Sequence, residues 1–158
     1  MAAGCTSGHP AATRSAPLST PPARSAPPTA EQRVQAAHFL ALATAGNTRL
    51  ERDFDRLDGP DRGRLAAARA DLRDAATTEH LFDQHLTALG FAPQTEATAK
   101  RLAAVNEARA DLTATAADVT SLQLLHQYEI QLTAANAPVE EAVSTIRSQL
   151  GLPPPATS

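Results

Sequence analysis

The spacing of the apolar residues is the feature that most limits how this chain can fold. Alanine and leucine recur in alternating steps of three and four, which is the repeat of one face of an α-helix. The first such stripe comprises Ala36, Leu40, Ala43, Asn47, Leu50, Phe54 and Leu57. Aromatic residues, which favour strands, are scarce, with four Phe, one Tyr and no Trp in 158 residues. The sequence therefore predicts an all-α fold.

Start and stop signals divide this periodic region into helices. The run Thr29-Ala30-Glu31-Gln32 has the form of a capping box, which begins a helix. The first helix is expected to end at Asp58-Gly59-Pro60, because Pro60 suits the first turn of a second helix. That second helix is expected to stop at Gly90, which can take the left-handed conformation, and the short loop predicts an antiparallel hairpin.

Two architectures are compatible with the remaining periodic residues. A continuous helix from Pro93 to Ala135 would be about 60 Å long, against about 45 Å for each of the first two, and would overhang them. Several Thr, Ser and Asp residues around Thr120 compete for backbone hydrogen bonds and favour a break there. We therefore predict an up-and-down four-helix bundle over residues 29–152, with an interruption or kink of the last helix at Pro138. A three-helix bundle with a long bent third helix is the alternative.

Both ends of the chain differ in composition from the bundle. Residues 6–28 are mostly Pro, Ala, Ser and Thr, and Leu18 is their single large apolar side chain. Such a segment cannot bury enough surface to offset the entropy of ordering, so residues 1–28 are predicted to form a disordered tether. Residues 153–158 are predicted to form a disordered C-terminal tail on the same grounds.

The single cysteine lies in a context that indicates a lipid anchor. Ala2, Ala3 and Gly4 precede Cys5, and the Pro/Ser/Thr-rich run that follows would hold a tethered domain clear of a surface. This stretch resembles the mature N-terminus of a bacterial lipoprotein whose signal peptide is truncated, and the helical region ending in LGLPPP looks like small helical lipoproteins of actinobacteria. The resemblance implies lipid on Cys5 and a location on the extracytoplasmic face of the cell membrane. A cytoplasmic protein with an inert thiol is the alternative.

Two polar residues occupy positions on the apolar stripes. Asn47 is expected to fix helix register through one buried hydrogen bond. Glu79 stands on the stripe of the second helix, where a carboxylate must find a cation, lie at a wet edge or keep its proton. Arg109, on the facing stripe of the third helix, is its natural partner. A structural Glu79–Arg109 pair or simple exposure at the bundle edge is the first interpretation, and a ligand site is the second.

A metal or small-ligand site is the alternative function. His126 and Glu129 lie three residues apart on one helical face, and Glu79 with His80 could approach them from the second helix. Imidazole and carboxylate groups are metal ligands. The Glu-x-x-His motif of ferritin-like di-iron proteins is, however, absent from the sequence.

The sequence contains no motif for catalysis or for a cofactor. It lacks G-x-S-x-G, and no Gly-rich loop follows a strand. A net charge of −3 with interleaved signs and few aromatic residues argues against nucleic-acid binding. No apolar run approaches the roughly 20 residues of a membrane span. We therefore expect a lipid-anchored helical bundle that binds or scaffolds, with no enzymatic activity and no cofactor. An unidentified protein partner or a second copy of the chain would complete the scaffold.

Overall fold

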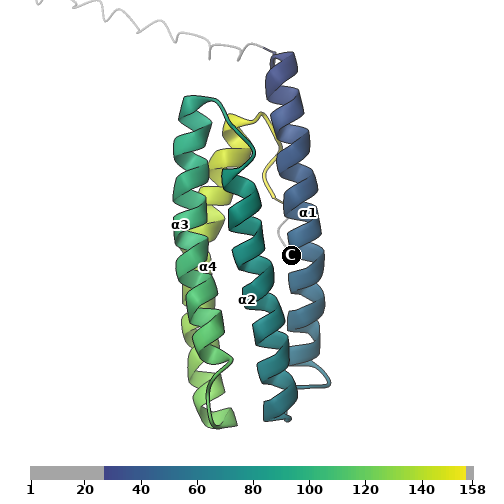
Figure 1. Ribbon diagram of the computed structural model, residues 1–158, viewed down its shortest axis with the longest axis vertical. Helices are drawn as coiled ribbons and strands as arrows, with labels where there is room; N and C mark the ends of the chain where they lie inside the picture. The colour runs from purple at the N-terminus through teal and green to yellow at the C-terminus, as the bar shows by residue number, and fades with distance from the viewer. Residues whose placement is uncertain (1–26, 156–158) are drawn as a thin grey trace, which may run out of the picture.

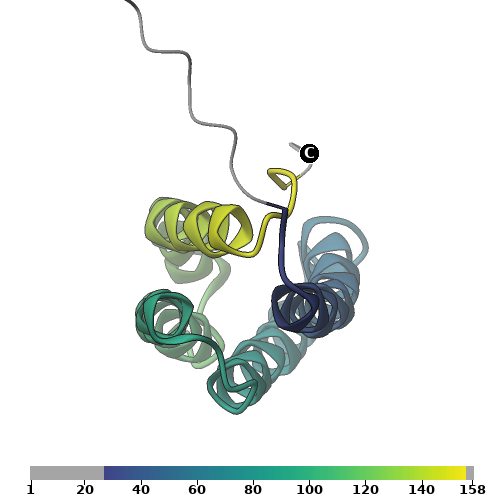
Figure 2. The same cartoon turned by 90° about the horizontal axis from the view of Figure 1, so that it is seen from above.

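Four helices form an up-and-down bundle in this computed structural model, which describes residues 27–155 (Figure 1). The helices are α1 (Ala30–Asp58), α2 (Leu65–Thr87), α3 (Pro93–Ala116) and α4 (Leu122–Gln149). Seen along the bundle, they follow one another around it in chain order (Figure 2). The predicted four-helix fold is confirmed, and the three-helix alternative is wrong because α3 ends before Thr120. Cys5 and nearly all of the predicted tether lie outside the described residues.

The predicted caps determine where the helices begin and end. The amide of Gln32 donates to Thr29 Oγ1 at 3.1 Å, and the amide of Thr29 donates to Gln32 Oε1 at 2.8 Å, which completes the capping box. Gly90 and Gly151 have φ values of 63° and 68°, the left-handed conformation that glycine adopts without a Cβ clash. Ser121 caps α4 by accepting from the amide of Leu124 at 3.2 Å. The two Leu-Gly stops therefore have the same structural cause.

The structure departs from the prediction at Pro60, and at Pro138 it excludes the predicted interruption of α4 but not the alternative kink. Pro60 does not open α2, because the amide of Asp61 donates to Arg56 O and that of Arg64 to Asp61 O, which makes the connection a series of turns. Pro138 lies inside α4, and the helix continues through it to Gln149. Packing of Ile146 in the core holds this last part of α4 against the bundle.

Two hydrophobic clusters fill the two halves of the bundle. The cluster nearer the start of α1 includes Phe39, Leu86, Leu102 and Ile146, all with 0% of their surface exposed. The cluster at the other end is built from residues of all four helices and of the connection between α3 and α4, namely Leu57, Ala68, Leu72, Ala116, Ala117, Val119, Leu125 and Leu132. The chain therefore has two apolar clusters, and the polar residues described below belong to neither of them.

The predicted stripes coincide only in part with the buried faces of α1 and α3. In α1, Ala36 and Leu57 are buried as predicted, but the large residue that is fully buried is Phe39, beside Leu40. In α3, Asn106 and Thr113 are buried, whereas their neighbours Val105 and Leu112 are only half-buried. Thr113 satisfies its hydroxyl by donating to the carbonyl of Arg109 at 3.0 Å, so it can face the interior.

None of the four described helices combines the length and the apolar character that a membrane crossing requires.

Candidate functional site: a cleft between α1 and α4

Helices α1 and α4 are the neighbouring pair whose backbones lie farthest apart. Helix α1 packs closely against α2, α2 against α3 and α3 against α4, whereas α1 and α4 meet through side chains of the two hydrophobic clusters. Two cavities lie between α1 and α4, and Arg109 lines both of them. We call them together the α1–α4 cleft. Its lining includes Gly46 and Asn47 of α1 and Asn136 and Val139 of α4.

The two cavities differ in their linings. The Val139 cavity has a volume of about 120 Å³. Its walls are the apolar side chains of Leu50, Phe82, Leu102, Val139 and Val143. The Glu129 cavity has a volume of about 260 Å³ and is more polar, because Asp58, Glu129 and Asn136 line it together with Phe54 and Leu132. The cleft thus has one apolar compartment and one mixed compartment, with the guanidinium between them.

A buried ion pair lies at the inner end of the cleft. Nη1 of Arg109 is paired with Oε1 of Glu79, and the two side chains are 12% and 0% exposed. Nε of Arg109 donates to Asn136 Oδ1 at 2.6 Å, and the guanidinium carbon lies 5.5 Å from the centroid of the Phe54 ring. Burial lowers the pKa of the Arg109 guanidinium from its usual value. Both carboxylate oxygens of Glu79 are fully buried, so Arg109 neutralises a charge that solvent does not reach.

A second polar contact continues this layer between α2 and α3. Nδ2 of Asn106 lies 3.1 Å from both carboxylate oxygens of Asp83 and 3.4 Å from the carbonyl oxygen of Glu79. Burial raises the pKa of the Asp83 carboxyl to about 7, the hydrogen bond from Asn106 lowers it, and the neighbouring charge of Glu107 raises it further. Glu79, Asp83, Asn106 and Arg109 therefore form a polar layer in the middle of the bundle.

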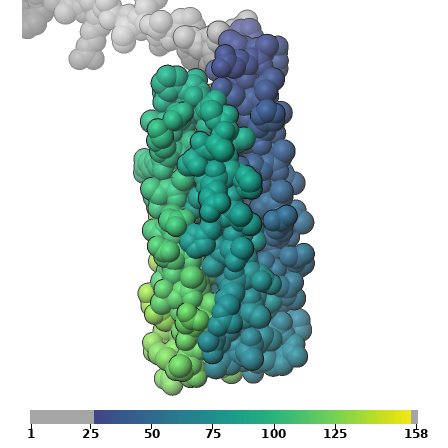
Figure 3. Space-filling view, in the orientation of Figure 1, coloured from purple at the N-terminus to yellow at the C-terminus, as the bar shows by residue number. Residues whose placement is uncertain are grey.

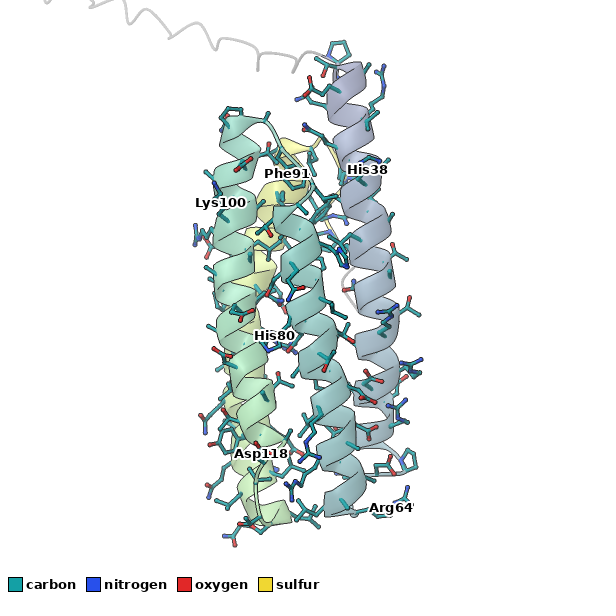
Figure 4. The ribbon with its side chains drawn as sticks, in the orientation of Figure 1. His38, Arg64, His80, Phe91, Lys100 and Asp118 are labelled. Atoms are coloured by element: carbon teal, nitrogen blue, oxygen red, sulfur yellow. The ribbon has the colours of Figure 1, made fainter. Side chains whose placement is uncertain are left out.

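Another group of potential ligands lies on the face where α2 meets α3. Figure 3 shows the side of the molecule formed by α1, α2 and α3, and Figure 4 shows His80 projecting from α2 toward α3. Nδ1 of His80 lies 2.9 Å from Glu107 Oε2. One donor atom each from His80, Glu107 and Asp111 all lie within 4.8 Å of one another, and this is the one such group of three in the described chain. Asp and Glu oxygens with an imidazole nitrogen suit a divalent transition metal.

The four residues predicted as ligands are divided among three places. Glu79 pairs with Arg109 inside the bundle, as the first interpretation of this residue predicted. His80 faces α3, because adjacent residues point about 100° apart on a helix. His126 and Glu129 pair with each other on α4 at 2.8 Å. The predicted four-residue metal site is therefore not assembled in the described structure.

The position of Asn47 differs from the prediction. Asn47 is exposed at the mouth of the Val139 cavity, so it is not the buried asparagine; Asn106 is. Sequence reasoning also missed a network in which Arg56 bonds Asp71 at 2.7 Å and Asp53 at 2.8 Å, although both aspartates are buried. A signal for it was present in the sequence, because Arg56 and Asp71 are 15 residues apart and the short loop of an antiparallel hairpin brings such residues of α1 and α2 into contact.

No protein-family model matches this chain, and no curated protein or solved structure matches it either. The geometry of its own residues is therefore the basis for a functional proposal.

Proposed function

We propose that the protein is a non-catalytic binding protein that holds a small molecule in the α1–α4 cleft. The observation that carries this proposal is the Arg109 guanidinium, which lines both cavities of the cleft and engages only part of its five N–H donors with Glu79 and Asn136. A hydrogen bond to a charged group contributes about 1.5–3 kcal/mol. A ligand that accepts a hydrogen bond from the remaining donors would gain that free energy on binding.

The dimensions of the cleft favour a small ligand. Drug-sized molecules occupy pockets of about 300–1,000 Å³, whereas a 150 Å³ apolar cavity is sufficient for benzene. The Val139 cavity, at about 120 Å³, matches a single ring or a short alkyl chain. The adjoining Glu129 cavity gives room for the polar end of a somewhat longer molecule.

Binding in the cleft can be tested with a variant that fills it. Val139→Phe places a ring in the Val139 cavity, and Ile130→Phe makes a comparable change on the same helix at a residue that is 64% exposed. Saturation-transfer NMR with a library of small fragments should detect binders to the wild-type chain and to Ile130→Phe, and these should be lost in Val139→Phe. Fragments that bind all three proteins equally, or no binders at all, would contradict the proposal.

The proposal includes a membrane tether through lipid on Cys5. Cys5 is the single cysteine, small residues precede it, and a Pro-rich run separates it from the capped start of α1. An acylated diacylglyceryl cysteine carries enough chains for stable anchoring, whereas a single chain anchors only marginally. On this proposal the bundle is displayed on the extracytoplasmic face of the membrane.

Mass spectrometry of the protein purified from its native host tests the tether. A lipid-bearing peptide that begins at Cys5 is expected, and Cys5→Ser should move the protein from the membrane fraction to the supernatant. An unmodified Cys5 still preceded by Ala2–Gly4 would exclude the anchor and leave the cleft proposal unaffected.

Divalent-metal binding is a second candidate function, favoured by the convergence of His80, Glu107 and Asp111 within 4.8 Å. Glu107 and Asp111 lie four residues apart and so share a face of α3 opposite His80. All three are at least partly exposed, which leaves coordination positions open to water. Zn²⁺ at micromolar to millimolar concentration should raise the melting temperature of the full chain by mass action.

The chain provides a matched control for the metal test. His126 also pairs with a glutamate, Glu129, at 2.8 Å, but no third ligand joins it in the described structure. His80→Ala should abolish the stabilisation by Zn²⁺, and His126→Ala should retain it. Equal responses of the two variants would show that the metal binds elsewhere.

A further inference from the structure

The charges that line the cleft restrict the kind of molecule that it can accept. Building on the proposed binding role, we infer that the ligand is a small primary amine, bound as its ammonium ion, that also carries an uncharged hydrogen-bond acceptor. Its ammonium end lies in the Glu129 cavity, and its acceptor faces the guanidinium of Arg109. Three properties of the described residues lead to this class. They are the excess of negative charge in the Glu129 cavity, the remaining donors of Arg109, and the apolar walls.

The Glu129 cavity carries more negative than positive charge. Asp58 and Glu129 line it, and the one positive charge among its described lining residues belongs to Arg109. Glu79 already neutralises Arg109 from inside the bundle, so the two lining carboxylates are left uncompensated. Nδ1 of His126 lies 2.8 Å from Glu129 Oε2, and even a protonated imidazole there would leave one carboxylate uncompensated. The cavity therefore attracts a cation and repels an anion.

The two carboxylates reach the cavity from different helices. Asp58 is the last residue of α1, where the helix dipole adds partial negative charge, and Glu129 belongs to α4. Asp58 is exposed and Glu129 is half-buried, so a cation between them keeps part of its hydration. A primary ammonium group has three N–H donors to share between the carboxylates and the hydroxyl of Thr133, which lines the same cavity. A quaternary ammonium has no N–H to donate, so the primary amine is the expected cation.

The guanidinium of Arg109 determines the second functional group. It is 12% exposed and lines both cavities, so a ligand in the cleft can contact it. Glu79 and Asn136 engage only part of its five N–H donors, and the remaining donors require an acceptor. An amide or hydroxyl oxygen accepts without bringing another negative charge beside the lining carboxylates. A carboxylate would add to their excess, so an uncharged acceptor is preferred.

The walls determine the body of the ligand. Phe54, Leu57 and Leu132 give the Glu129 cavity apolar surface, and the face of an aromatic ring such as Phe54 attracts cations. The volume of this cavity is about 260 Å³, whereas about 150 Å³ is sufficient for benzene. A chain of about four to six carbon atoms is therefore the expected size. Such a chain also separates the ammonium from Arg109, which carries the same sign of charge.

Four compounds with one carbon chain test this inference. They are 5-aminopentanamide, pentanamide, pentylammonium and 5-aminopentanoate, which differ only in their charged and accepting groups. Each is titrated into the full chain at pH 7, and the dissociation constant is taken from the methyl NMR signals of Leu132 and Val139. The amino amide should bind most tightly. Removing its ammonium should weaken binding roughly three- to tenfold, as expected for the loss of contacts with two partly exposed carboxylates.

Charge variants identify the groups that hold the cation. Asp58→Asn and Glu129→Gln should each weaken binding of the amino amide and leave that of pentanamide unchanged. Glu140→Gln makes the same change of charge on α4 at an exposed residue outside the cavity lining, so it should have no effect on either compound. Raising the salt concentration should weaken the amino amide and not pentanamide, because salt screens charges that solvent reaches.

The outcomes separate the ligand class from the binding role. If pentanamide or 5-aminopentanoate binds as tightly as the amino amide, the class inferred here is wrong, but the cleft still functions as a binding site. The class is also wrong if Asp58→Asn and Glu129→Gln act no differently from Glu140→Gln. If none of the four compounds binds while fragments sensitive to Val139→Phe exist, the class is again wrong. If no such fragments exist either, the binding role itself fails.

Discussion

The Glu79–Arg109 pair gives the most direct test of how much charge neutralisation inside the bundle contributes to the free energy of unfolding. Arg109→Leu would leave the Glu79 carboxylate fully buried without a counter-ion. Removing one partner of a buried pair costs about 3–5 kcal/mol. The loss of the hydrogen bond to Asn136 and of the contact with Phe54 adds about 1–2 kcal/mol. Since domains are stable by about 5–15 kcal/mol, the variant should fold with a much smaller margin.

The double variant Glu79→Leu/Arg109→Leu should behave in the opposite way. Replacing a buried pair by apolar residues of similar volume is neutral or stabilising by about 1–4 kcal/mol. Urea unfolding followed by far-UV circular dichroism gives the four free energies of the cycle, and their coupling isolates the pair from the contacts with Asn136 and Phe54. A loss of stability below about 1 kcal/mol for Arg109→Leu is typical of an exposed ion pair. Such a small loss, or additive effects of the two single changes, would contradict the reasoning that Glu79 and Arg109 interact strongly because they are buried.

Three further predictions concern the backbone, the titration of the interior and a helix cap. Gly46→Ala should stabilise the chain by about 0.5–1 kcal/mol, because Gly46 lies inside a helix and the new Cβ meets only the Phe82 ring at 3.6 Å. Gly90→Ala should instead destabilise the chain, because Gly90 has a φ of +63°. Urea unfolding measures both changes in the free energy of unfolding. The folded chain holds a proton on Asp83 up to about pH 7, against 3.8 for an unperturbed aspartate, so the free energy of unfolding should fall as pH rises through this window. Asp83→Asn should remove that part of the slope, and carboxyl ¹³C NMR should show the titration directly; an Asp83 signal that titrates near pH 4 would exclude it. Thr29→Ala breaks the capping box and should cost about 1 kcal/mol, seen as a lower melting temperature.

The helices could be predicted because their signals are local. The capping box at Thr29, the left-handed Gly90 and the polar run before Ser121 each act within one turn of the chain, and each ends or begins a helix in the structure. Pro138 was misleading because a missing helical hydrogen bond is a local cost, whereas the packing of Ile146 and Leu150 in the core is not visible from the neighbouring residues.

The site was only partly predictable, because its contacts depend on how the helices are rotated. Glu79 was recognisable as a carboxylate on an apolar stripe, and its pairing with Arg109 follows from facing stripes. Asp83 and Asn106 were missed, since the sequence does not show that Asn106 is more deeply buried than its apolar neighbour Val105. The cleft was not predictable at all, because it depends on the distance between two helices that are far apart in the chain.

Two hydrophobic clusters hold the ends of the bundle, and the Glu79–Arg109 pair lies at the level of the cleft between α1 and α4. Larger apolar residues at Asn47 and Glu79 would bury more surface and close the cleft, which would stabilise the fold. On the proposed binding role, the open cleft gives up that stability in the ligand-free state. A bound molecule that fills the space would restore part of it, so a ligand should raise the melting temperature of the chain.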